Sequence, residues 1–456
     1  MNRSGAVSDP RSPEEREEDR RAVYRQVSAL GESTRDDASR QQAAGRVRER
    51  RGGRSDLVQF EFVRDNAGND TPVVQGEFLV RADLRDDDDV WQRLRTLFEL
   101  SESDEPEYID CLDNRLVRWS NATINGDQLD EIARSVRASG HQASVNHVPP
   151  LGLIIKGGTG PEPSALAEWQ FTAPDAAASQ VKVAVIDTGI TDQARPDGWL
   201  TGIARVADNA AETTSGNVDV LDTLPGNGDG FLDFAAGHGT FVMGIIAQVA
   251  PGAEIVAYRA VDTDGVGTEV DVACAMVRAV REGARILNLS LGGPTLDDQP
   301  LLAVEVALEL IDEMEGGQDV IVVTAAGNDA SSRPCWPAAS RRMVAVAALT
   351  SDMTPAGWSN RGHWVDCSTV GEGLLSTYVK GKEAPELDPT PDSWESEDAW
   401  AVWSGTSFAA PQIAGEIARR CLADPALTPR QALVDLLASG KPVPDFGRAV
   451  RLLPGT

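Results

Sequence analysis

The sequence predicts an α/β protein built around a mostly parallel sheet, and two observations indicate this. First, several runs of apolar residues are nearly continuous, which is typical of strands buried on both faces of a sheet. These runs are 181–186, 286–291, 320–323 and 343–349. Second, stretches with helical periodicity lie between them. These are 241–249, 270–281 and 301–314. Strands that alternate with helices favour parallel pairing, with helices covering both faces.

Four segments of different composition follow one another along the chain. Residues 1–54 are polar and rich in Arg and Glu, so we expect a disordered, charged tail. Residues 55–150 predict a small α+β module, because strand-like and helical stretches alternate in it. Residues 151–175 are rich in Gly, Pro, Ala and Ser, which is typical of a linker. The α/β domain then occupies residues 176–456.

Each element of the module has its own signal. The order strand, helix, strand, helix, strand suits a split βαβ sandwich. The five stretches are 73–80, 90–98, 116–119, 126–139 and 142–148. Near the end of the α/β domain, a further helix is expected to begin with Thr428 as N-cap and Pro429 as first residue, and Gly440 ends it.

The composition excludes several classes of protein. The chain has 456 residues, of which 41% are hydrophobic, so a large core is expected and wholesale disorder is excluded. The net charge of −29 disfavours nucleic acids and anionic membranes as partners, because phosphate contacts need a basic surface. The sequence contains no run of 18 apolar residues, so it predicts no membrane-spanning helix.

The N-terminus and the cysteines bear on cellular location. The first residues are charged and lack the apolar stretch of a secretory signal, so we expect a cytoplasmic protein, with export by a non-standard route left open. Five cysteines do not make a disulfide scaffold, and we expect reduced thiols. Cys335 and Cys367 would be candidates to pair if the protein were exported.

Asp187 follows the first apolar run, in Val185-Ile186-Asp187-Thr188-Gly189. A carboxylate at the carboxyl end of a parallel strand faces the usual ligand crevice of such a sheet. Two other readings remain open for this residue alone. A strand-end Asp is often a turn former, and Asp-Thr-Gly also opens the motif of aspartic proteases.

His238 lies in Gly237-His238-Gly239-Thr240, directly before an apolar helical stretch. A helix N-terminus keeps an imidazole neutral, which suits a general base. The flanking glycines leave room around the backbone. A structural histidine with satisfied hydrogen bonds is the alternative.

Ser407 and Asn328 supply the remaining candidate groups. Ser407 begins a helix within Gly405-Thr406-Ser407-Phe408, where its hydroxyl faces outward and its N–H points at any nearby oxyanion. An ordinary N-cap serine is the alternative. Asn328 ends a strand, where its amide would stabilise a tetrahedral oxyanion or simply form a turn.

The order of these residues is informative. Asp187, His238 and Ser407 run Asp, His, Ser, which is neither the α/β-hydrolase nor the chymotrypsin order. With this order on a parallel α/β sheet, the chain resembles the subtilisin-like serine proteases, or subtilases, over about 176–420. The matching blocks are 185–190, 237–242, 288–293, 325–328 and 405–411.

The resemblance implies a subtilisin-like three-layer fold and a serine endopeptidase that forms an acyl-enzyme. Ser407 would be the nucleophile, His238 the base and Asp187 the group that orients the imidazole. Asn328 and the Ser407 N–H would form the oxyanion hole. Two further sets would bind the polypeptide substrate: Ser290, Leu291 and Gly292 by strand pairing, and Ala325, Ala326 and Gly327 as a pocket wall.

Three positions depart from the family pattern. Phe241 stands where the family usually has a second histidine, Phe408 where it has methionine, and Gln412 where it has histidine. None of these is a member of the triad, so they bear on the geometry near the substrate and not on the reaction type.

The 55–150 module resembles the family's inhibitory propeptide in its position and its order of elements. The most similar stretch is 122–126, which leads into a helix. The resemblance implies that the segment around 147–155 lies in the active-site cleft until it is cut, and that the module is an intramolecular inhibitor. An uncleaved accessory domain is the alternative.

A loop rich in glycine and acid is a weak candidate for calcium. It offers the oxygen ligands of Asp222, Asn227, Asp229 and Asp233 but lacks the EF-hand pattern, so a plain turn is the alternative. The expected chemistry requires no cofactor, and calcium would be a structural ion.

Two other functions stay open. The first is a pseudoprotease or regulatory binding module that keeps the fold and is held shut by its N-terminal module. The second is an aspartic protease that uses Asp187, which would leave the serine block unexplained. The intact set of candidate groups favours the serine endopeptidase.

Overall fold

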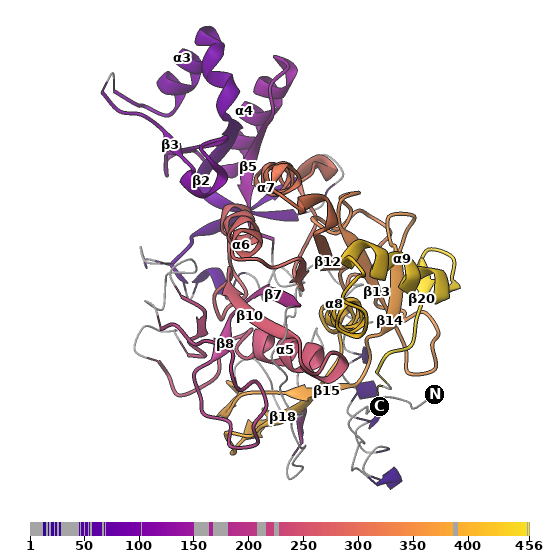
Figure 1. Ribbon diagram of the computed structural model, residues 1–456. Coiled ribbons are helices and arrows are strands. Elements are labelled where there is room, and N and C mark those ends of the chain that lie inside the picture. The colour runs from indigo at the N-terminus through magenta and orange to yellow at the C-terminus, as the bar shows by residue number, and fades with distance from the viewer. Residues whose placement is uncertain are drawn as a thin grey trace.

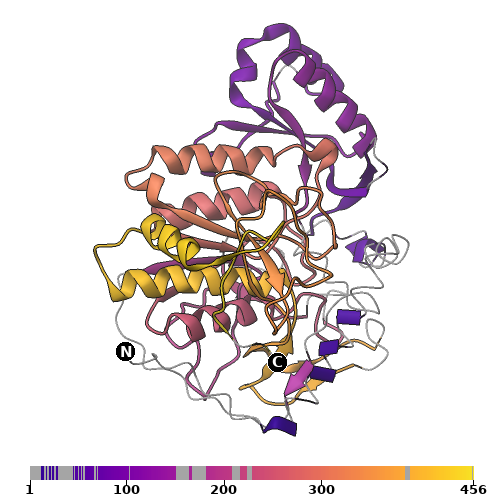
Figure 2. The same ribbon diagram turned by 90° about the vertical axis from the view of Figure 1, so that its right-hand side faces the viewer.

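The computed structural model describes most of the chain. The described residues are 57–65, 68, 70–101, 103–149, 164–166, 181–207, 216–222, 228–385, 391–453 and 455, with scattered positions between 12 and 54. The chain forms an α/β domain with a smaller α+β module packed on one side of it, as Figures 1 and 2 show.

An eight-stranded sheet runs through the α/β domain. Its strands are parallel apart from the last pair, and their order is β10-β7-β11-β12-β13-β14-β20-β19. Their bounds in that order are Glu254–Arg259, Lys182–Asp187, Ile286–Leu289, Ile321–Ala325, Val344–Leu349, Cys367–Val370, Arg448–Ala449 and Lys441–Pro442. The central strands are buried on both faces, which explains their continuous apolar sequences.

Helices cover both faces of this sheet. α6 (Glu269–Arg281) and α7 (Leu302–Glu313) pack together on one face, and α5 (His238–Val249) and α8 (Thr406–Ala423) on the other (Figure 1). α9 (Pro429–Ser439) packs on α8 and has Thr428 as its N-cap and Pro429 as its first residue, as predicted. Thr428 forms a capping box with Gln431. The predicted three-layer α/β fold is confirmed.

Small sheets and single-turn helices complete the domain. A three-stranded antiparallel sheet has the order β15-β18-β6, and β18 leads directly into α8. These strands are Leu374–Thr377, Trp400–Trp403 and Ser164–Leu166. The other short elements are β8 (Ile190–Thr191) with β9 (Val218–Asp219), β16 (Gly381–Lys382) with β17 (Ser393–Trp394), η3 (Leu296–Asp298) and η4 (Gly317–Asp319).

The module holds two helices on an antiparallel sheet. Its strands are β1 (Phe60–Arg64), β2 (Asp70–Arg81), β3 (Glu107–Tyr108), β4 (Leu116–Ser120) and β5 (Ala143–His147). Its helices are α3 (Asp88–Leu97), α4 (Gly126–Ala138) and the short η1 (Ala82–Asp86) and η2 (Asp110–Leu112). Buried aromatic rings, including Trp91 against Trp119 at 4.8 Å, fill its own small core.

The module rests on α6 and α7, and Figure 2 shows it above them. Exposed ion pairs ring the contact, among them Arg81–Glu309, Arg115–Glu313 and Arg281–Asp113. Such pairs contribute little each, about 0.2–1 kcal/mol, so they orient the module more than they hold it.

A disulfide joins the module to the α/β domain. Cys111 of η2 and Cys274 of α6 are bonded, with their Cα atoms 5.4 Å apart and a separation of 163 in the sequence. The expectation of reduced thiols is therefore wrong for this pair. Cys335 and Cys367, which the sequence singled out, are buried free thiols.

Residues 1–54 and 151–175, which we expected to be a disordered tail and a linker, each contain an ordered part. Arg51 falls within the segment expected to be a disordered tail, yet its side chain is only 1% exposed and pairs with Asp262 and Asp264. A polar composition does not prevent burial of an arginine when carboxylates neutralise it. Within the expected linker, Ser164–Leu166 forms β6, and the rest of 151–175 lies outside the described residues.

Candidate active site

Three element ends bring the predicted orienting carboxylate, base and nucleophile to one edge of the sheet. Asp187 is the last residue of β7, His238 is the first residue of α5, and Ser407 is the second residue of α8. The Gly-His-Gly pattern has a steric reason. A Cβ on Gly237 would lie 2.8 Å from the Tyr378 ring, and one on Gly239 would lie 2.2 Å from the Gly189 carbonyl oxygen.

Asp187 and His238 form a buried pair. Nδ1 of His238 donates to Oδ1 of Asp187 at 2.7 Å, and both side chains are fully buried. The same Oδ1 accepts the backbone N–H of Thr188 at 2.8 Å. Nε2 of His238 has no hydrogen-bond partner among the described residues. The Asp187 bond fixes the neutral tautomer in which Nε2 is the free base.

Ser407 lies at the N-terminus of α8, where its backbone N–H has no acceptor within the helix. Its hydroxyl donates to the carbonyl oxygen of Ser290 at 3.2 Å. The ring of Phe408, the next residue, contacts the His238 ring at a tilt of 43°, with centroids 5.3 Å apart. This contact brings the start of α8 to the imidazole.

Asn328 presents an unused donor beside Ser407. Its Oδ1 accepts the backbone N–H of Thr406 at 3.0 Å and the Thr406 hydroxyl at 2.8 Å. Its Nδ2 is buried and has no acceptor in the described part of the chain. The carbonyl side of the amide is thus held firmly, and the N–H₂ side is available to an oxyanion.

The six residues predicted to bind substrate lie at the ends of β11 and β12. Ser290 and Leu291 are buried, and Gly293 pairs with Trp336 through two backbone hydrogen bonds just beyond Gly292. After β12, the Ala326 N–H donates to Val346. Gly327 N–H donates to the Thr406 hydroxyl at 3.0 Å, and Ala325 is the last residue of the strand.

The three departures from the family pattern fit together. Phe241 and Phe408 contact each other with ring centroids 4.6 Å apart, and Trp403 contacts both of them and His238. Gln412 is fully buried and donates to the carbonyls of Val370 and Phe408. The rings of Phe408 and Trp403 therefore pack directly against the imidazole, with Phe241 behind them, and Gln412 holds the carbonyls of α8 and β14 instead.

Asp219 is a buried neighbour of Asp187 and His238 that the sequence did not reveal. Its Oδ2 accepts the Gly237 N–H at 2.8 Å and the Thr188 hydroxyl at 2.9 Å. It therefore braces the residue before His238 and the residue after Asp187. Burial raises the pKa of Asp219 to about 7, although these hydrogen bonds oppose the rise. Its two-residue strand, β9, leaves no periodic signal.

The described calcium candidates already take part in hydrogen bonds within the chain. The Asp222 carboxylate accepts the N–H groups of Asp229 and Gly230, and Asp233 accepts the Thr263 hydroxyl. Asn227 lies outside the described residues. Across the described chain, no group of three or more His, Cys, Asp or Glu side chains could hold a metal ion. Calcium stays a prediction.

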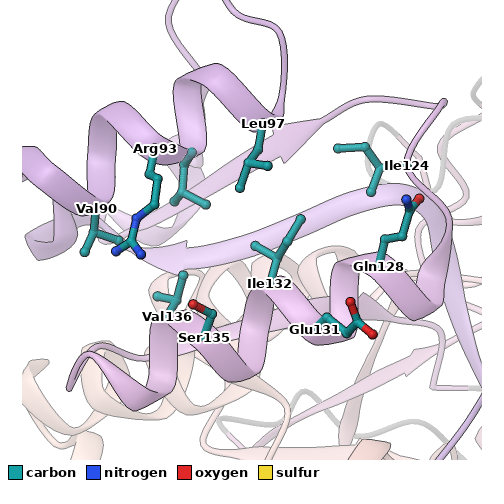
Figure 3. A pocket seen from close by; sticks show the side chains of 10 residues that line it. Val90, Arg93, Leu97, Ile124, Gln128, Glu131, Ile132, Ser135 and Val136 are labelled. Atoms are coloured by element: carbon teal, nitrogen blue, oxygen red, sulfur yellow. The ribbon is translucent and has the colours of Figure 1, made fainter.

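A groove of about 410 Å³ lies in the module rather than at the triad (Figure 3). α3 and α4 line it with apolar side chains such as Leu97 and Ile132, and Arg93, Gln128 and Glu131 add polar groups. None of the predicted site residues lines this groove. No helix in the described chain is both long and apolar enough to cross a membrane.

Comparisons with known proteins point to one family. The model of the subtilase family, peptidase S8, matches residues 178–440. Thermitase of Thermoactinomyces vulgaris is 31% identical over 249 residues, which cover 52% of this chain and 73% of thermitase. A thermophilic serine proteinase of Bacillus sp. (strain AK1) is 32% identical over 249 residues, covering 54% of this chain and only 53% of the relative.

A comparison with solved structures finds the same fold in a subtilisin-related enzyme. The structure of fervidolysin from Fervidobacterium pennivorans, described as a keratinolytic enzyme related to subtilisin, superposes with a TM-score of 0.59. The match covers 87% of this chain and 62% of fervidolysin at 19% identity, so it speaks for the fold alone. With the family model matching more than half of its length, the chain belongs to the subtilase family of subtilisin-like serine peptidases.

Proposed function

We propose that the chain hydrolyses peptide bonds as an endopeptidase, with Ser407 as nucleophile, His238 as base and Asp187 as the group that orients the imidazole. The observation that carries the proposal is the buried Asp187–His238 pair, whose Nε2 stays unpaired in the described structure next to the start of α8. A polypeptide is the substrate.

In this mechanism the Ser407 hydroxyl turns from the Ser290 carbonyl toward Nε2 of His238 and gives up its proton as Oγ attacks the scissile carbonyl carbon. The imidazolium is stabilised by Asp187 and then protonates the leaving amine. Water attacks the resulting acyl-enzyme with His238 again as the base, which releases the second product and restores Ser407. Nδ2 of Asn328 and the N–H of Ser407 stabilise the oxyanion in both steps.

The substrate would lie across the ends of β11 and β12. Ser290, Leu291 and Gly292 would pair with its main chain, and Ala325, Ala326 and Gly327 would line the pocket for the residue before the cut bond. The two serines already contact each other, so the predicted substrate edge and the nucleophile are mechanically joined.

The N-terminal module restrains the protease in this proposal. Its strand β5 ends at His147, whose backbone N–H and Nδ1 both approach Oε1 of the fully buried Glu269 at 3.0 Å. The Ser407 hydroxyl, which donates to Ser290 and not to His238, supports a latent state. A regulatory pseudoprotease held shut by its N-terminal module would also keep the contact between His147 and Glu269. A pseudoprotease or binding module is therefore the second candidate function.

The Cys111–Cys274 disulfide changes what processing would achieve. A cut between the module and β7 would leave two chains joined covalently, so the module would be a standing regulator until a thiol reductant opens the bond. The cytoplasmic location stays a prediction, and this disulfide argues against it, because disulfides persist in oxidising compartments.

Intact-mass spectrometry with a fluorophosphonate probe tests the function. We expect an adduct on the wild type and none on Ser407→Ala. N-terminal trimming that is lost in the same variant would add self-processing. An adduct without trimming would make the module a standing regulator, and no adduct on either protein would move the binding-module function to first place.

A further inference from the structure

The segment between β10 and α6, residues 260–268, lies against the backbone of Asp187 and against the residues that lead into His238. Its Ala260 N–H donates to the Asp187 carbonyl at 3.0 Å. The N–H of Ala235, three residues before His238, donates to the Thr263 carbonyl at 2.5 Å. We call residues 260–268 the acidic segment, because Asp262 and Asp264 lie in it.

The end of β5 shows where an extended chain enters beside this segment. His147 contacts Glu269 on one side and accepts the Leu296 N–H at Nε2 on the other, at 3.4 Å. Val148 packs with Val266 in one apolar cluster. An extended chain therefore runs between the acidic segment and the residues that follow Ser290. If a polypeptide substrate follows the path of residues 147–148, the substrate residues beside the acidic segment lie on the N-terminal side of the bond that is cut.

The acidic segment holds a buried guanidinium. Nη1 of Arg51 lies 2.8 Å from Oδ2 of Asp262 and 3.0 Å from Oδ2 of Asp264. The three side chains are between 1% and 8% exposed. Nε of Arg51 donates to the Val58 carbonyl, and Gln59 donates to the Arg51 carbonyl. The cation thus comes from the N-terminal side of the chain and the two anions come from the catalytic domain.

The Asp262 carboxylate is held by backbone groups of its own segment, independently of the guanidinium. Its Oδ1 accepts the N–H groups of Asp264 and Val266 at 3.1 Å, and a turn closes between Asp262 and Gly265. This arrangement leaves Oδ2 for the guanidinium. Two carboxylates held this close in a buried place repel each other unless a cation lies between them. The pair is built to bind one positive charge.

We propose that Asp262 and Asp264 form a subsite for an arginine or lysine side chain of the polypeptide substrate, on the N-terminal side of the bond that is cut, and that Arg51 fills this subsite in the full chain. The inference rests on the proposed proteolytic function. Substrates would then be selected by a basic residue upstream of the cut, and the N-terminal region would restrain the enzyme by supplying the same group from within.

A peptide series measures this selection directly. The full-length Arg51→Gln protein, in which the internal guanidinium no longer fills the subsite, is given peptides that carry Arg, Lys, Gln or Met at each of six positions before the cut. We expect its kcat/KM for Arg over Gln to differ at least about tenfold at one position, and the ratio to fall within about twofold when Asp262→Asn/Asp264→Asn is added. Adding Asp352→Asn/Asp435→Asn instead, which removes two exposed charges elsewhere, should leave the ratio of Arg51→Gln unchanged.

Arg51→Gln provides a second measurement that does not disturb the acidic segment itself. Without the internal guanidinium, KM for Arg peptides should fall about tenfold, while KM for the matched Gln peptides stays within about twofold. Equal changes for both peptide sets would overturn the subsite, because they would mean that Arg51 only anchors the N-terminal region.

The outcomes separate the two proposals. A protein that neither cleaves peptides nor reacts with fluorophosphonate contradicts the protease itself. An Arg51→Gln protein that cleaves peptides with no basic preference, or with a preference that survives the double Asp variant, contradicts only the subsite. Reaction with fluorophosphonate without cleavage of any peptide, in both the wild type and Arg51→Gln, also rules against the subsite.

Discussion

Ser290 and Ser407 hold each other through two reciprocal hydrogen bonds. The Ser290 hydroxyl donates to the Ser407 carbonyl at 2.7 Å, and the Ser407 hydroxyl donates to the Ser290 carbonyl at 3.2 Å. Asn288 Nδ2 donates to the same Ser290 hydroxyl at 3.0 Å. The end of β11 and the start of α8 are thereby fixed, which places the proposed nucleophile relative to the expected substrate edge.

Ser290→Ala should therefore disturb both folding and catalysis. It leaves the buried Ser407 carbonyl and the Asn288 amide without this partner, which costs about 1–3 kcal/mol of unfolding free energy. Chemical denaturation measures the loss. We also expect kcat to fall more than KM rises, because the nucleophile is less well positioned. Unchanged stability would contradict the anchoring role.

Asn328→Asp separates the two ends of the Asn328 side chain. One carboxylate oxygen still accepts from Thr406, while the other replaces the free donor and repels an oxyanion. We expect kcat to fall about 10²–10³-fold or more, a range known from a subtilisin and so carried over from the family. Fluorescence-monitored unfolding should show a folded protein. A fall of less than threefold would remove Asn328 from the oxyanion hole.

Asp219 should make stability depend on pH. Its folded pKa of about 7 lies above the ordinary value of 3.8, so the folded state binds the proton more tightly. The contribution to stability is full below pH 3.8 and is lost as the pH rises through about 7. Asp219→Asn should abolish this slope. Thermal unfolding of both proteins between pH 4 and 8 measures it, and parallel curves would show that Asp219 does not titrate there.

The disulfide predicts how a nicked chain behaves. After one cut within 151–175, denaturing electrophoresis without reductant should show a single species, and with reductant two fragments. Cys111→Ser should give two fragments in both conditions and lower the unfolding free energy by about 2–5 kcal/mol. Cys335→Ser is the matched control, because Cys335 is a buried free thiol. Two fragments from the unreduced wild type would show that the bond is absent.

The alternation of buried strands and amphipathic helices was enough to predict the fold. The runs at 181–186 and 343–349 correspond to β7 and β13, and the helix predicted at 270–281 is α6. These signals are local, because burial on both faces or on one stripe leaves a pattern in the sequence itself. β1 was missed, since only Phe60 and Val63 of its five residues are buried and no alternation results.

The site residues also divide into those with a local sequence signal and those without one. Asp187, His238 and Ser407 sit at element ends with recognisable glycine-rich neighbours, and the fold brings the first two within 2.7 Å. Asp219, Arg51 and the Cys111–Cys274 bond could not be predicted, because each depends on a contact between segments far apart in the chain. The sequence around one residue of such a contact does not identify the residue that it contacts.

The short strand Ser164–Leu166 limits where the chain can be cut without damage. It covers one edge of β18, whose other edge is already paired with β15. A cut before Ser164 keeps β6 on the chain that carries β18. A cut after Leu166 would leave β6 on the module's fragment, so that opening the Cys111–Cys274 disulfide and losing that fragment would expose unpaired backbone groups of β18 directly upstream of α8. Exposed strand edges recruit other chains. The position of processing would thus decide whether the mature enzyme stays monomeric or begins to aggregate.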